Sequence, residues 1–235
     1  MATPEPAPES DFCPLGECDG SGWLLDEENN ARPCGCLRQR VNRARGRHLG
    51  TGIPRRFRGI SFERQPVCDL DPFVLRRVRG FVRDVAANLE EGRGMWFHGD
   101  VGTGKTSLAM LISKAAIEAG KSVAIYSVPH LLADIKGTYE GARGDSYLQL
   151  FRRLTGVDLL HLDDLGAERR TEWVLEQLYS IVNERWQDQR SIVVTTNLMV
   201  DDLREQVGPR TVSRLAEICG DPIPIMGADL RISTG

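Results

Sequence analysis

An eight-residue stretch, Gly99 to Thr106, restricts the possible folds of this chain more than any other. It reads Gly-Asp-Val-Gly-Thr-Gly-Lys-Thr and fits the pattern Gly-x4-Gly-Lys-[Ser/Thr], which joins a strand to a helix. The apolar run Met95 to Phe97 precedes it, and a helical pattern begins at Lys105. Glycines let backbone N–H groups turn inward around phosphates, and the helix N-terminus adds donors and a favourable dipole. The stretch predicts a nucleotide phosphate site; the alternative is a glycine-rich turn that binds nothing.

The residues of this loop are expected to have different chemical roles. Lys105 is expected to neutralise the β- and γ-phosphates, and Thr106 to give its hydroxyl to a Mg²⁺ ion that bridges them. The predicted ATP-binding residues are Gly99, Asp100, Val101, Gly102, Thr103, Gly104, Lys105, Thr106 and Ser107.

Two further apolar runs end in polar residues. Leu159 to Leu162 leads into Asp163 and Asp164, and ligands collect at the carboxyl edge of open α/β sheets. Asp163 is expected to hold Mg²⁺, while Asp164 would orient or deprotonate the attacking water. The strand from Ser191 to Thr196 ends at Asn197, which could hydrogen-bond that water or the γ-phosphate. Otherwise, the aspartates cap a turn, and Thr-Asn is an ordinary strand end.

The hydrophobic pattern predicts an α/β fold with a five-stranded parallel sheet flanked by helices. The expected strands are 95–97, 122–128, 157–163, 191–196 and 222–226, and the expected helices are 70–90, 105–119, 131–137, 171–187 and 200–207. Such alternation implies right-handed crossovers between parallel strands. At 235 residues and 41% hydrophobic content, the chain can form one main domain and a small appendage.

The expected domain organisation follows composition. Residues 1–10 carry prolines and glutamates with little to bury and are expected to be a disordered tail. Residues 11–37 form a cysteine-rich lobe, 38–60 a basic linker and 61–235 the α/β domain. The linker region holds arginines 38, 40, 43, 45, 47, 55, 56 and 58 and no acidic residue. It could contact DNA phosphates, or be a solvated helix or a surface for an acidic protein.

Four cysteines occur early in the chain, at Cys13, Cys18, Cys34 and Cys36. Their spacing, C-x4-C followed by C-x-C with glycines nearby, predicts a tetrahedral zinc site that drives folding of the small lobe. Reduced thiols without a metal are the alternative. Cys68 and Cys219 lie apart from the cluster and are interpreted as structural residues.

Composition excludes several classes of protein. The net charge of −3 commits the chain neither to nucleic acid nor to a membrane. It contains no apolar run of about 18 residues, and its N-terminus lacks the pattern of a signal peptide. We therefore expect a cytoplasmic protein.

Taken together, these segments resemble AAA+ ATPases of the DnaC/DnaI helicase-loader and IstB group. The resemblance spans about Ile53 to Arg231 and rests on IPRRFRGISFE, GDVGTGKTSLA, LLHLDDLGAERRTEWVLEQLYSIVNERW, SIVVTTNL, RTVSRLAE and GADLR. The cysteine spacing resembles the zinc lobes of some DnaI-like loaders, although the first pair departs from the commoner C-x2-C. Many related ATPases have Glu at the position of Asp164, so the shorter side chain suggests slow hydrolysis.

The resemblance carries further implications. The Asn197 strand should lie between the strands of the P-loop (residues 99–106) and Asp163, with Asn197 as the sensor-1 residue. ATP-bound subunits should assemble side by side, with Arg214 as the arginine finger that reaches a neighbour's γ-phosphate. Arg231 matches the sensor-2 position, although no helical lid domain is expected. Either arginine could instead be a surface residue.

The function implied is ATP-dependent loading of a hexameric replicative helicase onto single-stranded DNA, with the zinc lobe docking the helicase. An IstB-like transposition helper is the first alternative, and a nucleotide-bound interaction module with a vestigial ATPase is the second. Tyr139, Arg143 and Tyr147 are expected in a loop that could line a central channel, where aromatic rings could stack on bases; core or surface residues without a DNA contact are the alternative.

Overall fold

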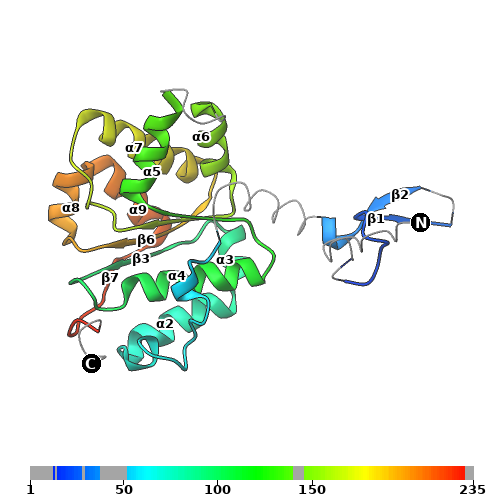
Figure 1. The fold of residues 1–235 in the computed structure, drawn as a ribbon, viewed down its shortest axis with the longest axis horizontal. Coiled ribbons are helices and arrows are strands. Elements are labelled where there is room, and N and C mark those ends of the chain that lie inside the picture. Colours follow the sequence, from blue (N-terminus) through cyan, green and yellow to red (C-terminus); the bar gives the residue numbers. More distant parts are fainter. Residues whose placement is uncertain (1–12, 14, 28–29, 38–51, 140–145, 231–235) are drawn as a thin grey trace, which may run out of the picture.

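The computed structural model of the chain describes residues 13, 15–27, 30–37, 52–139 and 146–230. At its centre is a five-stranded sheet with the spatial order β4-β5-β6-β3-β7 (Figure 1). The strands are β3 (Met95–His98), β4 (Val123–Ser127), β5 (Leu159–Asp163), β6 (Ser191–Thr196) and β7 (Ile223–Pro224). Neighbouring strands are parallel throughout. The predicted α/β class is confirmed, and β6 lies between β3 and β5 as the resemblance implied.

Helices cover both faces of this sheet. They are α2 (Pro72–Arg83), α3 (Val85–Glu90), α4 (Lys105–Glu118), α5 (Val128–Tyr139), α6 (Tyr147–Gly156), α7 (Glu172–Gln187), α8 (Val200–Val207) and α9 (Pro209–Cys219), with short 3-10 helices η1 (Arg55–Phe57) and η2 (Val67–Asp69). Among these described helices, none is long and apolar enough to cross a membrane.

The sheet separates two apolar cores. Helices α5 to α9 lie on one face of the sheet and α2 to α4 on the other (Figure 1). Trp96 of β3 packs in the core of the first face, whereas its neighbours Met95 and Phe97 pack in the core of the second. Successive side chains of a strand point to opposite faces, so both faces of β3 need apolar residues. The strands therefore read as continuous apolar runs, which made them recognisable from sequence.

Local signals explain where the helices differ from expectation. The helix expected over 70–90 is two helices, because Asp84 leaves the helical region with φ −106° and ψ 26°. It begins only at Pro72, since the Asp71 carboxylate accepts hydrogen bonds from two backbone N–H groups of the first turn. Helices α6 and α9 were not predicted. The first begins at a capping box formed by Ser146 and Gln149.

Helix α6 changes the setting of the residues predicted to line a channel. Tyr139 ends α5 and Tyr147 begins α6, so neither lies in the loop expected from the glycines there. The two rings stack with centroids 5.4 Å apart. Arg143 lies outside the described residues.

Residues 53–60, assigned to the basic linker from sequence, pack on the α/β domain. Ile60 is buried in the core beside α4, and Ile53 and Phe57 pack against the same core. The Ile60 carbonyl accepts a hydrogen bond from Lys114 of α4. The domain therefore begins before residue 61. The linker positions 38–51 and the expected tail 1–10 lie outside the described residues.

The N-terminal lobe contains an antiparallel hairpin of β1 (Trp23–Leu25) and β2 (Ala31–Pro33). Its buried apolar cluster consists of cysteines, with Leu24 packed against them. Such a small core gives little hydrophobic stabilisation, so the lobe needs another source of stability.

Candidate functional site

The loop between β3 and α4 adopts backbone conformations that favour glycine. Gly99, Gly102 and Gly104 have φ values of 140°, 81° and 98°. A side chain at Gly99 would collide with the Ile225 carbonyl oxygen. The glycines therefore let the loop backbone curve at the N-terminus of α4, an arrangement that favours anions.

Lys105 points its ammonium group into the curve of this loop. Its Nζ donates hydrogen bonds to the carbonyl oxygens of Gly99 at 2.8 Å and Asp100 at 2.6 Å. Thr103 braces the same turn by donating to the Asp100 carbonyl. The positive charge of Lys105 is thus held where it could neutralise phosphates bound in the loop.

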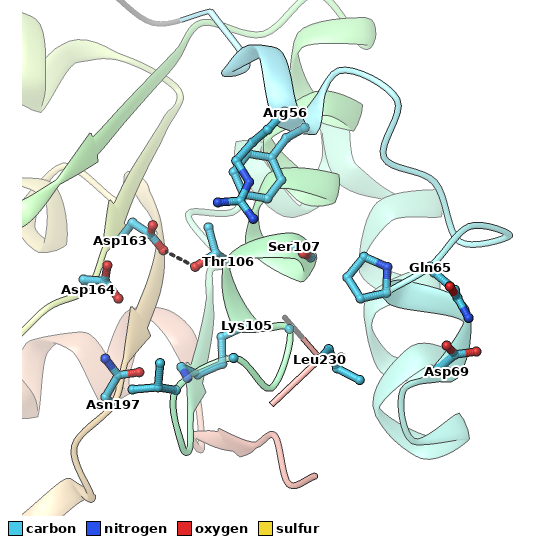
Figure 2. Close-up of a pocket in the computed structure, with 15 residues that line it drawn as sticks. Arg56, Gln65, Asp69, Lys105, Thr106, Ser107, Asp163, Asp164, Asn197 and Leu230 are labelled. Atoms are coloured by element: carbon cyan, nitrogen blue, oxygen red, sulfur yellow. Dashed lines mark hydrogen bonds between the residues drawn. The ribbon is translucent and has the colours of Figure 1, made fainter. Parts of the chain in front are cut away.

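Asp163 connects the loop to the sheet. Its Oδ1 accepts a hydrogen bond from Thr106 at 3.0 Å and one from Thr195 at 2.6 Å, and the former is drawn in Figure 2. His161 Nε2 lies 3.8 Å from the same oxygen. Burial raises the pKa of Asp163, but the contacts with His161, Thr195 and Thr106 outweigh it and hold the pKa below its usual range. The carboxylate is therefore kept ionised.

Asp164 and Asn197 directly follow the neighbouring strands β5 and β6 and lie beside Asp163 (Figure 2). Asp164 has a φ of 56°, a left-handed conformation that is uncommon outside glycine. Its backbone N–H donates to Thr195 Oγ1 at 3.0 Å. Lys105, Thr106, Asp163, Asp164 and Asn197 thus line one end of the same pocket.

The pocket has a volume of about 870 Å³ and extends beyond the phosphate loop. Its other lining residues are Arg56, Phe57, Gln65, Pro66, Asp69, Val101, Gly102, Gly104, Ser107 and Leu230. In Figure 2, Gln65 and Asp69 lie across Ser107 from the carboxylates. The contribution of residues 56–69 to this pocket was not predicted from the sequence. The apolar spacing of Ile53, Phe57 and Ile60, which anchors this segment, was the available signal.

The segment after β7 contacts the glycine-rich loop at Gly102. The Leu230 N–H donates to the Gly102 carbonyl at 3.1 Å, and the Asp229 carboxylate lies against the same glycine. Arg231, the predicted sensor-2 residue, lies outside the described residues.

Arg214, the predicted arginine finger, does not line the pocket of its own chain. It lies on α9, where it forms an ion pair with Glu217 at 2.8 Å and stacks over the Trp186 ring at 3.5 Å from the centroid. Trp186 in turn donates from Nε1 to Glu217. This placement is compatible with a residue that acts on another subunit.

The predicted zinc ligands come together in the N-terminal lobe. The sulfur atoms of Cys13, Cys18, Cys34 and Cys36 lie within 4.8 Å of one another. The Cys13–Cys34 and Cys18–Cys36 sulfur separations are 3.8 and 3.4 Å. A tetrahedron with zinc–sulfur bonds of about 2.3 Å has edges of about 3.8 Å, so the donor set fits zinc.

The cysteine environments are unequal. Backbone N–H groups, that of Cys18 first, lower the pKa of the Cys13 thiol to about 6, whereas burial raises that of Cys36. Metal binding would therefore release protons. Neither Cys68, which is exposed, nor Cys219, which lies against β6 with its sulfur 3.3 Å from the Ile192 carbonyl oxygen, belongs to the cluster.

The sheet order, the glycine-rich loop, the two aspartates at the end of β5 and the asparagine after β6 define the class of protein: an AAA+ P-loop ATPase. A family model described as IstB-like ATP binding protein matches residues 22–215. The chain belongs to this family.

Its relatives include proteins named as helicase loaders. The replicative helicase loader DnaC of Escherichia coli (strain K12) is 28% identical over 192 residues, which cover 81% of this chain and 73% of the relative. DnaC of Buchnera aphidicola (subsp. Schizaphis graminum) is 28% identical over 166 residues, covering 70% and 66%. A crystal structure of the DnaC helicase loader superposes with a TM-score of 0.62 at 25% identity, covering 74% of this chain and all of that one. The matches to the two DnaC sequences thus span about two thirds to three quarters of those relatives' length.

Proposed function

We propose that this protein is an ATP-dependent loader of a hexameric replicative helicase. The observation that carries the proposal is the similarity to DnaC across most of the chain, combined with a pocket that holds the residues needed for ATP hydrolysis. A loader of this kind acts in the cytoplasm, where the replicative helicase works.

The two ends of the pocket bind different parts of the nucleotide. The phosphates bind in the loop of residues 99–107, where Lys105 neutralises their charge. Thr106 and Asp163 offer the oxygen ligands that Mg²⁺ prefers. A Mg²⁺ ion held by these residues would supply positive charge that neutralises the negative charge developing on the phosphates. The base and ribose lie toward Phe57 and Gln65, where apolar surface and an amide group are available.

Hydrolysis requires an oriented water molecule beyond the γ-phosphate. Asp164 and Asn197 lie where two adjacent strands end, so a carboxylate and an amide face the same position. Asp164 acts as the general base or orienting group, and Asn197 holds the water or the γ-phosphate.

Arg214 completes the site of a neighbouring subunit. To reach that site, the Arg214 guanidinium has to leave Trp186 and Glu217. The environment of the Trp186 ring should therefore change when subunits assemble. Replacing Arg214 with alanine should lower hydrolysis only at protein concentrations that permit assembly. Arg210→Ala, an exposed arginine one turn earlier on the same helix, is the control. Equal losses in both variants would argue against the finger.

The lobe around the cysteine cluster binds one zinc ion and docks the helicase. Exposed apolar side chains on this lobe, Leu15, Trp23 and Leu25, support a role in protein contact.

Single-stranded DNA contacts the ends of α5 and α6, where Tyr139 is 58% exposed and stacks on Tyr147. Unchanged single-strand affinity after replacing Tyr139, Arg143 and Tyr147 with alanine would remove this contact.

Sedimentation with the partner tests the proposed function directly. The protein is mixed with the host's hexameric replicative helicase, with ATP and without nucleotide, and Lys105→Ala serves as the control. A complex that depends on ATP and on Lys105 is expected.

The family description favours one alternative, an IstB-like transposition helper. Oligomers on DNA with ATP, but no helicase complex under any condition, would support that alternative. Nucleotide binding without single-turnover hydrolysis would support a vestigial ATPase.

A further inference from the structure

Thr195 occupies an unusual position beneath the hydrolysis site. It is completely buried in β6, and its hydroxyl contacts both Asp163, which ends β5, and Asp164, which follows it. Oγ1 is 2.6 Å from Asp163 Oδ1 and 3.0 Å from the backbone nitrogen of Asp164. A buried hydroxyl costs free energy unless it is hydrogen-bonded, and both partners of this one belong to the site.

The chemistry of the groups determines the direction of both hydrogen bonds. An ionised carboxylate only accepts, so the Thr195 hydroxyl donates its proton to Asp163. A backbone N–H only donates, so the same oxygen accepts from Asp164. One hydroxyl therefore joins the side chain of one aspartate to the backbone of the next.

The second bond acts on a strained position. Asp164 has a φ of 56°, and a non-glycine residue in this region needs support from its surroundings. The hydrogen bond from its N–H to Thr195 holds the turn that brings Asp164 to the pocket. Meanwhile Thr106 donates to the Asp163 oxygen that Thr195 also contacts, so Asp163 is held from two sides.

The adjacent threonine shows that this arrangement is specific. Thr196 is equally buried and also makes two hydrogen bonds, to the Leu165 carbonyl at 2.7 Å and from the Leu198 N–H at 3.1 Å. Both partners are backbone groups outside the carboxylate pair. Neighbouring positions of one strand thus offer a matched comparison.

We propose that Thr195 is a positioning residue for ATP hydrolysis, which orients Asp163 toward the metal and Asp164 toward the attacking water. The proposal rests on the proposed ATPase function. It extends that function from the residues that face the nucleotide to a buried hydroxyl that faces neither nucleotide nor solvent.

Thr195→Val tests the proposal because valine has a similar shape and lacks both hydrogen bonds. We expect single-turnover hydrolysis to fall about 30- to 100-fold. The Mg²⁺ concentration that half-saturates Mg²⁺-dependent nucleotide binding should rise about tenfold, as for other residues that orient metal ligands. Affinity for a fluorescent ATP analogue without Mg²⁺ should change less than about twofold, since the phosphate loop is intact.

Two controls separate positioning from general damage. Thr195→Ser keeps the hydroxyl and should recover hydrolysis and Mg²⁺ dependence to within about threefold of the original protein. Thr196→Val removes an equal number of hydrogen bonds from the same strand and should retain at least about one third of the hydrolysis rate. Circular dichroism melting verifies that each variant folds. If Thr195→Val does not fold, Thr195→Ala replaces it.

The outcomes distinguish this proposal from the underlying function. Equal losses in Thr195→Val and Thr196→Val, or an unchanged Mg²⁺ requirement in Thr195→Val, would overturn the positioning role. If the unaltered protein binds nucleotide but does not hydrolyse it, the ATPase proposal fails, and the Mg²⁺ requirement alone decides whether Thr195 positions Asp163. If the protein binds no nucleotide in a Lys105-dependent manner, both proposals are wrong.

Discussion

Three polar side chains surround the carboxylate of Asp163, and they determine how this residue responds to pH. Burial disfavours its charge, yet His161, Thr195 and Thr106 hold the pKa below the usual 3.8. A carboxyl group with a depressed pKa stabilises the folded state at pH values above the unfolded-state pKa. That contribution is lost as the pH falls from 3.8 through the lower folded-state pKa.

Asp163→Asn should therefore lower the free energy of unfolding by about 1–2 kcal/mol near neutral pH, because hydrogen bonds to a charged acceptor are lost. The difference from the original protein should shrink below about pH 4, where the native carboxyl also becomes protonated. Urea denaturation between about pH 6.5 and pH 3, without nucleotide or Mg²⁺, measures it. A difference that grows on acidification would contradict this account of Asp163.

At the scale of elements, Arg185 of α7 joins three segments of the fold. It is fully buried, and its guanidinium donates hydrogen bonds to five backbone carbonyl groups. These belong to Leu154, Thr155, Val157, Asp158 and Ser191. The contacts satisfy the C-terminal carbonyls of α6 and tie them to the starts of β5 and β6. Strands β5 and β6 lead to Asp163 and Asn197 at their C-terminal ends. Arg185 therefore supports the site from the N-terminal ends of the same two strands.

Arg185→Met should destabilise the protein by about 3–5 kcal/mol, since it leaves buried carbonyl groups without a donor. Arg190→Met is the matched control. Arg190 is partly exposed and pairs with Asp158 at 3.4 Å, so its loss should cost less than about 1 kcal/mol. Urea unfolding midpoints provide the comparison. Similar values for the two variants would mean that the carbonyl contacts of Arg185 contribute little.

At the scale of the whole molecule, the lobe and the α/β domain draw stability from different sources. The α/β domain has two apolar cores, whereas the lobe has a cluster of cysteines. Metal binding should therefore control the lobe alone.

Removal of zinc with a chelator should unfold the lobe and leave nucleotide affinity unchanged within about twofold. Metal analysis of the purified protein should find one zinc per chain. Cys34→Ser should lose the metal, whereas Cys68→Ser, which alters an exposed cysteine outside the cluster, should keep it. Hydrogen exchange of residues 15–37 and titration with a fluorescent ATP analogue measure both effects. Loss of nucleotide binding together with zinc would show that the domains depend on each other.

Much of the site could be predicted from sequence because its residues follow local patterns. The phosphate loop, Asp163 and Asn197 each come directly after an apolar run, and parallel strands bring such endings to one edge. The four cysteines were recognisable from spacing alone. Helices α6 and α9 were missed although local signals were present. Helix α6 has a capping box and apolar residues four apart at Leu150 and Leu154, and α9 has a proline after Gly208 and apolar residues three apart at Val212, Leu215 and Ile218.

Local sequence patterns were sufficient to predict the class of fold, the order of its strands along the chain and the chemistry at their ends. Which of these groups come into contact depends on how the chain packs. Arg56 and Gln65 line the candidate nucleotide pocket because Phe57 and Ile60 pack their segment against the core near α4. Thr195 meets both aspartates because β5 and β6 are neighbours in one register. Such contacts join residues far apart in sequence, and they depend on packing and strand pairing, which no local pattern encodes.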